Sequence, residues 1–132
     1  MNTTLDQIIE INNGEPVIKE NVPMEYYQKG IYQWWHDIYG CIYVGISAVD
    51  TENKNDGMPL RALHHARKLL SKEKDNTQPT KKWTNFSKKF LEGNNQLNEI
   101  KIVYENHPQK SKRDLEELEH QLINKIKPIC NA

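Results

Sequence analysis

The alternation of apolar and polar positions is most regular over residues 29–47, which read KGIYQWWHDIYGCIYVGIS. Aromatic and β-branched residues surround a short turn-like centre, and this composition is typical of strands. The pattern predicts an antiparallel hairpin. If the hairpin closes about Asp37 and Ile38, Tyr32 lies directly opposite Tyr43 and both phenols project from one face. Paired tyrosines on a small sheet usually serve packing, and a functional site is the alternative interpretation.

Helical periodicity recurs in four stretches of the chain. Leu5, Ile8 and Ile9 predict a short helix over residues 4–12. Pro59 suits the first turn of a second helix, whose apolar stripe ends at Leu70. The apolar positions of the last two helices are Trp83, Phe86 and Phe90, and then Leu115, Leu118, Leu122, Ile123 and Ile126.

Residues 100–104 alternate between apolar and polar side chains, which predicts a third strand. The predicted order is helix, strand, strand, helix, helix, strand, helix. This order favours an α+β fold, in which helices pack around a small three-stranded antiparallel sheet. We divide the chain into a short N-terminal helical extension, residues 1–27, and one domain, residues 28–132.

Composition narrows the class of protein. A chain of 132 residues is long enough for one hydrophobic core and too short for two. Charged residues make up 27% of the chain, and no apolar run approaches the length of a membrane span. The first residues lack the features of a secretory signal. Cys41 and Cys130 are the only cysteines, and their sequence context favours buried thiols over a disulfide or a zinc site, so we expect a cytoplasmic protein.

The formal net charge is zero, but the charge is unevenly distributed along the chain. Residues 61–90 hold nine Lys or Arg against two acids, a net charge of +7, and the other 102 residues carry −7. A basic segment on an acidic chain indicates an anionic partner such as a phosphate backbone, although a solvated helix face is the alternative. The candidate DNA-binding side chains are Arg67, Lys68, Lys81, Lys82, Lys88 and Lys89.

Two helical patterns suggest chemistry in addition to packing. Glu119 lies inside the apolar stripe of the last helix, between Leu115 and Ile123. A carboxylate turned toward a core is costly unless it meets a cation or a metal, and the alternative is that it curls outward at the edge of the stripe. Arg61 and His65 are four residues apart, so they lie one turn apart on the same flank of their helix.

These motifs, taken in order, resemble those of the GIY-YIG nuclease domain. GIY stands at residues 30–32 and YVG at residues 43–45. The pair Arg61 and His65 matches the third family feature, and LEHQLI at residues 118–123, followed by KP and Asn131, matches the fourth. The resemblance covers about residues 28 to 131, nearly the whole chain.

The resemblance implies hydrolysis of DNA phosphodiester bonds with one divalent metal, Mg²⁺ or Mn²⁺, in each active site. It implies that Tyr32 is the general base, that Arg61 clamps the scissile phosphate and that Glu119 holds the metal. These residue types suit the chemistry, because a carboxylate is a ligand that Mg²⁺ accepts and a guanidinium neutralises growing negative charge. A phenol titrates near ~10, so Tyr32 needs adjacent positive charge to act as a base.

The resemblance also implies supporting roles for three residues. Tyr43 and His65 orient water or bind phosphate, with His65 as an alternative base, and Asn131 holds the wall of the site through hydrogen bonds. The favoured function is a bacterial or phage endonuclease of restriction, phage-defence or mobile-element type, for which a homodimer is one way to cut both strands. The alternatives are a structure-specific repair-type nuclease module, a catalytically inactive nucleic-acid-binding domain and a protein-interaction domain.

Overall fold

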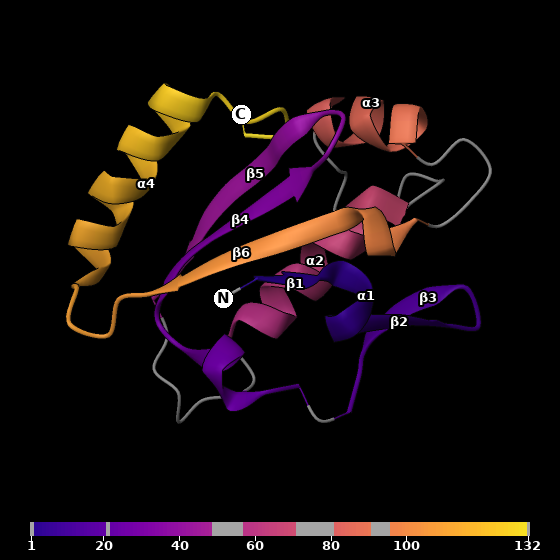
Figure 1. The fold of residues 1–132 in the computed structure, drawn as a ribbon, viewed down its shortest axis with the longest axis horizontal. Coiled ribbons are helices and arrows are strands. Elements are labelled where there is room, and N and C mark those ends of the chain that lie inside the picture. Colours follow the sequence, from indigo (N-terminus) through magenta and orange to yellow (C-terminus); the bar gives the residue numbers. More distant parts are fainter. Residues whose placement is uncertain (1, 21, 49–56, 71–80, 91–95, 132) are drawn as a thin grey trace.

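The computed structural model describes residues 2–20, 22–48, 57–70, 81–90 and 96–131 (Figure 1). The chain starts with β1 (Asn2–Thr4), α1 (Leu5–Ile8), β2 (Ile9–Asn12) and β3 (Glu15–Ile18). It continues through β4 (Gly30–His36), β5 (Gly40–Ser47), α2 (Met58–Leu70), α3 (Lys81–Phe90), β6 (Ile100–Asn106) and α4 (Lys112–Ile126). Short 3-10 helices lie at Met24–Tyr27 and Leu97–Glu99.

The main sheet is antiparallel, with the strand order β1-β6-β4-β5, so β5 forms one edge. The α+β class is therefore confirmed, but the prediction of a three-stranded sheet was wrong. The additional strand is β1, in which Thr3 pairs with Ile102 of β6. A strand of three residues is too short to show the period-2 alternation by which strands are predicted from sequence.

The predicted helix over residues 4–12 was also mostly wrong. Only the four residues of α1 are helical, and β2 pairs with β3 in a separate two-stranded sheet. The turn between these strands consists of Asn13 and Gly14, both with positive φ (51° and 82°), as a type I′ hairpin turn requires. The Asn-Gly dipeptide was the sequence signal for this hairpin, and the helical spacing before it concealed the signal.

The tyrosine pair lies on one face of the sheet, but its register differs from the prediction. Tyr32 pairs with Gly45, and Tyr43 pairs with Trp34. The two phenols are therefore diagonal neighbours instead of direct opposites, with ring centroids 6.2 Å apart.

Two local features cause this shift of register. The hairpin closes with His36 opposite Gly40, which leaves a three-residue turn, and Gly40 has a φ of +73°. An irregularity at Trp34 and Trp35 then adds one residue to β5. A bulge of this kind inserts an unpaired residue and changes the pairing beyond it.

The remaining predicted elements are confirmed. Helix α2 includes Pro59 in its first turn, and both α3 and β6 lie where the periodicity placed them. The Oγ of Ser111 caps α4 by accepting a hydrogen bond of 3.1 Å from the backbone N–H of Asp114. Lys127 ends α4 in a left-handed conformation, with Pro128 following it.

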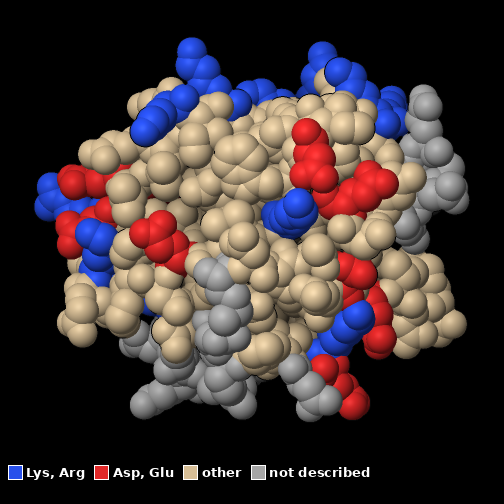
Figure 2. Space-filling model, viewed as in Figure 1, with Lys and Arg blue, Asp and Glu red and all other residues tan. Residues whose placement is uncertain are grey.

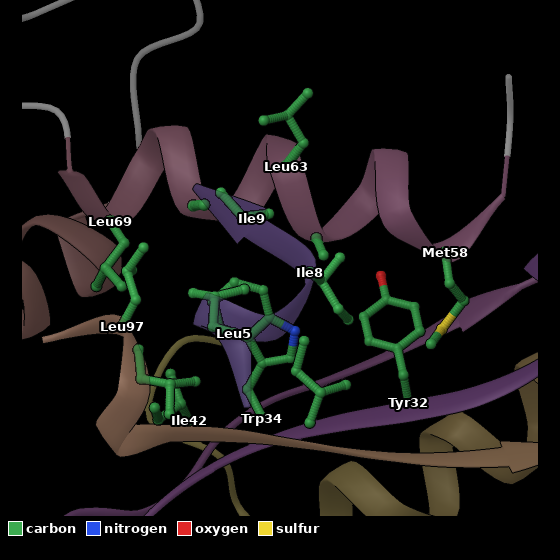
Figure 3. Packing of buried hydrophobic residues seen from close by; sticks show 14 of the residues in the cluster. Leu5, Ile8, Ile9, Tyr32, Trp34, Ile42, Met58, Leu63, Leu69 and Leu97 are labelled. Carbon is green, nitrogen blue, oxygen red and sulfur yellow. The ribbon is translucent and has the colours of Figure 1, made fainter. Parts of the chain in front are cut away.

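Helices cover both faces of the main sheet (Figure 1). The larger hydrophobic cluster joins α1, α2 and α3 to the face that carries Tyr32 and Trp34. The smaller cluster joins α4 to the opposite face, through Ile31, Val44 and Leu115. Figure 3 shows Tyr32 and Trp34 rising from the sheet toward α2, with the α4 ribbon on the other side. The β5 edge therefore lies between two helical layers.

The N-terminal segment contributes to the core that the rest of the chain builds. Leu5, Ile8 and Ile9 are buried in the same cluster as Trp34 (Figure 3). Their burial explains why α1 is stable although a helix of four residues has almost no stability of its own. No helix in the described ranges is long and apolar enough to cross a membrane.

The approach of β4 to β6 makes a prediction at Gly30. A Cβ atom at this position would lie 2.0 Å from the backbone oxygen of Glu105, so Gly30→Ala is expected to lower the free energy of unfolding by about 3 kcal/mol. Gly14→Ala is the matched comparison, because a Cβ there meets nothing within 4 Å and only the positive φ is unfavourable, which costs about 1 kcal/mol. Urea denaturation measures both values, and equal losses would contradict the close approach.

Candidate active site

A cleft of about 380 Å³ lies beside the edge strand β5. Its walls come from the sheet and from both helical layers. Tyr43 belongs to the cluster on the α2 side and Ile46 to the cluster on the α4 side, so the cleft reaches around the edge of β5. The lining residues are Tyr32, Tyr43, Ile46, Arg61, Glu116, Glu119 and His120.

The structure brings together four of the predicted catalytic residues. Tyr32 and Tyr43 reach the cleft from β4 and β5, Arg61 reaches it from α2, and Glu119 from α4. The other two, His65 and Asn131, do not line the cleft. His65 contacts Tyr32, which lines it, and Asn131 contacts Val44, which adjoins the lining residue Tyr43. Residues up to 87 positions apart in sequence therefore converge on one small space.

The position of Tyr32 depends on the absence of a side chain at Gly45. A Cβ atom at Gly45 would lie 2.5 Å from both Cζ and Oη of Tyr32 and 2.8 Å from Cε1 of Tyr43. Both rings therefore pack directly against the backbone of this glycine. The glycine of the YVG motif makes room for the phenols, and its role here is close packing.

Tyr32 is almost fully buried, with 2% of its surface exposed, although it borders the cleft. Burial raises the pKa of its phenol well above the ordinary value of 10.0, and Tyr43 raises it further. Arg61 acts in the opposite direction but does not outweigh burial. The Tyr32 phenol is therefore neutral at physiological pH in this state of the protein.

The buried side chain of His65 contacts the Tyr32 hydroxyl group. Its Nε2 lies 3.3 Å from the Tyr32 hydroxyl oxygen, and its ring stacks on Trp83 with an interplanar angle of 5° and a centroid distance of 5.2 Å. The ring of Tyr43 lies 4.3 Å away. Burial, followed by the nearby Lys68, lowers the pKa of His65 from 6.5 to about 3. The imidazole is therefore neutral, and its aromatic neighbours determine its orientation.

Glu119 and Arg61 form the more exposed part of the cleft. Arg61 is exposed on α2, whereas Glu119 is half-buried on α4. The largest effect on the pKa of Glu119 is burial, which raises it. The next effects, in order of size, come from His120, which lowers the pKa, from Glu116, which raises it, and from Arg61, which lowers it. Because burial is the largest of these effects, the ionised carboxylate is not fully compensated by the surrounding protein. A cation bound beside Glu119 would relieve this cost.

The oxygen atoms in the cleft suit a hard divalent cation. Within the described part of the chain, no three His, Cys, Asp or Glu side chains converge as a ligand set. Mg²⁺ does not require such a set, because it commonly binds one or two carboxylates and keeps water and phosphate oxygens as its other ligands. Glu119 is the residue that fits this role, and Glu116 lines the same cleft one turn earlier on α4.

Asn131 acts on the backbone of β5. Its side-chain Oδ1 accepts a hydrogen bond of 2.9 Å from the N–H of Val44, and its Nδ2 donates one of 2.9 Å to the Val44 carbonyl. Val44 lies between Tyr43 and Gly45. The carboxamide therefore pairs with the outer edge of β5 as a neighbouring strand would, at the position that carries the two phenols.

Sequence analysis missed three residues that line the cleft, namely Ile46, Glu116 and His120. Glu116 and His120 could have been predicted from their spacing relative to Glu119. They lie three residues before and one residue after Glu119, so Glu116, Glu119 and His120 share one side of α4. Ile46 follows from the register of β5 and had no comparable signal.

The basic candidates lie on the described parts of α2 and α3, and residues 71–80 between these helices are outside the described ranges. Figure 2 shows Lys and Arg gathered along the upper rim, over α3 and the end of α4. Arg67 is exposed and Lys68 is half-buried, and the exposed lysines of α3 are Lys81, Lys82, Lys88 and Lys89. Lys82 differs from the others in this group, because its Nζ donates a hydrogen bond of 2.8 Å to the Asn131 carbonyl.

Comparisons with known proteins found no matching family model, no matching curated protein and no matching solved structure. The function therefore has to be inferred from the cleft itself. Its features are a buried phenol, an exposed guanidinium and a half-buried carboxylate, contributed by three elements of the fold.

The buried state of His65 makes a prediction about stability and pH. The unfolded chain protonates His65 near its ordinary pKa of 6.5, whereas the folded protein does so only near about 3, so stability falls as the pH falls between these values. We expect a loss of about 2 kcal/mol from this group between about pH 6 and about pH 4. His65→Phe should remove that part of the slope, and His64→Gln, an exposed neighbour, should keep it.

Urea denaturation at several pH values measures the slope. A His65→Phe protein that loses stability with acid as steeply as the wild type would show that His65 is not the group responsible.

Proposed function

We propose that this protein is a metal-dependent endonuclease that hydrolyses phosphodiester bonds of DNA, and that it belongs to the GIY-YIG type that its motifs resemble. The observation that carries the proposal is the convergence of Tyr32, Arg61 and Glu119 on one open cleft. Packing does not require a phenol, a guanidinium and a carboxylate from β4, α2 and α4 to meet at a sheet edge. Hydrolysis of a phosphodiester requires groups of these three types.

Arg61 is the group that would bind the scissile phosphate. It is exposed at the cleft, and a guanidinium presents two parallel N–H donors that match two phosphate oxygens. Its positive charge also stabilises the negative charge that grows on these oxygens in the transition state. Its position on α2, four residues before His65, places this charge on the same helix flank as the histidine behind Tyr32.

Glu119 would hold the divalent metal, with Glu116 available from the preceding turn of α4. A bound Mg²⁺ or Mn²⁺ supplies Lewis-acid stabilisation of the phosphate and of the leaving oxygen. The partial burial of Glu119 makes this carboxylate a better cation ligand than an exposed one, because water competes less for its charge.

Tyr32 would direct the attacking water. A neutral phenol is not a base, so Tyr32 has to give up its own hydroxyl proton before its oxygen takes one from water. Because His65 is neutral, its Nε2, 3.3 Å from the Tyr32 oxygen, is positioned to receive that proton. Loss of the Tyr32 proton requires more positive charge in the cleft than Arg61 provides alone, because burial raises the pKa of the phenol. A divalent metal held by Glu119 would supply that charge.

DNA is the proposed substrate because the basic surface adjoins the cleft. The ring of Trp83 on α3 lies 5.7 Å from that of Tyr43, so α3 borders the proposed site directly. The exposed side chains of Lys81, Lys88 and Lys89 on α3 would therefore contact the strand on either side of the scissile phosphate. A restriction-like or phage-defence role, with two copies of the chain cutting the two strands, is the biological setting we propose.

A second candidate function is a nucleic-acid-binding domain that keeps the fold but does not cut. The burial of Tyr32 and the raised pKa of its phenol favour this alternative. The intact set of Tyr32, Arg61 and Glu119 in one cleft favours the enzyme, because a binding domain has no need of the set.

Cleavage of a supercoiled plasmid separates the two candidates. The wild type is expected to nick the plasmid with Mg²⁺ and to stop when a chelator is added. Tyr32→Phe and Glu119→Gln should each reduce the rate by at least about 100-fold, since each removes a group that acts on the reacting atoms, with little change in DNA affinity. Glu117→Gln is the matched control, because Glu117 is an exposed acid on the same helix and lies outside the catalytic cleft.

Absence of metal-dependent cutting by the wild type, with binding retained, would support the inactive domain. If the Tyr32→Phe variant cuts at the wild-type rate, Tyr32 is not the general base, and the nuclease assignment still stands.

A further inference from the structure

The segment after α4 runs along the outer edge of β5 and forms hydrogen bonds with it. The backbone N–H of Ile129 donates to the Cys41 carbonyl at 3.2 Å, and that of Cys130 donates to the Ile42 carbonyl at 2.8 Å. The Asn131 side chain then continues the same line of hydrogen bonds by pairing with Val44. The position of β5 beside the cleft therefore depends on this segment.

Lys82 ties this segment to the first turn of α3. Its Nζ donates to the backbone oxygen of Asn131 at 2.8 Å, and its own backbone oxygen lies 4.0 Å from the Cys130 sulfur as a thiol hydrogen-bond acceptor. The next residue, Trp83, is the one that stacks on His65. The start of α3 thus contacts two residues that lie behind the cleft, namely His65 through an aromatic ring and Asn131 through a charged hydrogen bond.

We propose that Lys82 is a positioning residue of the proposed active site, and that its ammonium group acts through Asn131 instead of through a DNA phosphate. This inference rests on the proposed function and deepens it, because it separates one lysine of the basic surface from the others. The ammonium fixes the Asn131 backbone, and the Asn131 carboxamide fixes Val44, which lies between Tyr43 and Gly45.

The physical reason lies in the edge position of β5. A strand at the edge of a sheet has a row of backbone groups that its sheet partner does not satisfy, so its outer contacts decide how firmly it is held. A hydrogen bond from an ammonium group is stronger than one between neutral groups. At Gly45 the packing against Tyr32 leaves no spare room, so a small movement of this backbone moves the phenol.

Lys81 offers a matched comparison on the same helix turn. It is exposed like Lys82 and carries the same charge, so both variants change the net charge of α3 equally. A role for Lys82 in DNA binding alone would make the two substitutions alike. A positioning role predicts that the Lys82 substitution changes the cleavage rate and the exchange of the Val44 amide, whereas the Lys81 substitution changes the affinity for DNA.

The experiment compares Lys82→Met, Lys81→Met and Lys82→Arg. For Lys82→Met we expect the Val44 amide to exchange with solvent about tenfold faster than in the wild type, because its acceptor Asn131 is less firmly held. The single-turnover cleavage rate with Mg²⁺ should fall by about tenfold, while the Kd for DNA in Ca²⁺ changes by less than about twofold. Lys82→Arg, which keeps a cationic donor, should recover most of both losses.

For Lys81→Met we expect a weaker Kd and a dependence of log K on log salt that is shallower by about one unit, with exchange at Val44 as in the wild type. The proposal is overturned if Lys82→Met shows that same pattern. Exchange at Val44 is read without catalysis, so a wild-type protein that does not cut would refute the proposed function and leave this test of Lys82 in place.

Discussion

The close packing of the Tyr32 ring against the backbone of Gly45 is the constraint on which the rest of the site depends. A Cβ at Gly45 would lie 2.5 Å from the phenol oxygen, so the two strands allow one arrangement of the ring. The hairpin register makes this contact by pairing Tyr32 with Gly45, and the pairing of Val44 with Asn131 holds β5 in place from its outer side. The helices then bring Arg61 and Glu119 to the same edge.

This arrangement has an electrostatic consequence. The packing that fixes the orientation of Tyr32 also removes it from water, which raises the pKa of the phenol and opposes its use as a base. The orientation of Tyr32 therefore suits a general base, but without added positive charge its phenol stays protonated. On the proposed function, the positive charge of a bound divalent metal would offset the burial, so the base would become effective only in the metal-loaded site. Such an arrangement would keep Tyr32 inactive until the metal is bound.

The elements with long, regular patterns could be predicted from the sequence, whereas the short ones could not. Helix α4 follows from five apolar positions and a serine cap, but β1 has three residues and no period to detect. The side-chain types of the site were visible because Glu119 interrupts an apolar stripe and Arg61 precedes His65 by one turn. The register was not visible, because it depends on a three-residue turn ending at Gly40 and on a bulge at Trp34. The contact of Lys82 with Asn131 required the tertiary structure, since the sequence does not indicate which residue a charged surface side chain contacts.

The proposed function depends on one claim, that Tyr32, Arg61 and Glu119 form a single metal-binding and phosphate-binding cleft. Paramagnetic broadening by Mn²⁺ tests this claim most directly, because broadening in an NMR spectrum falls steeply with distance from the ion. In the Tyr32→Phe protein bound to duplex DNA, Mn²⁺ should broaden the backbone amides around Glu119, Tyr43 and Arg61, and the additional change Glu119→Gln should remove the effect. Broadening centred on another part of the fold, or broadening that persists with Glu119→Gln, would contradict it.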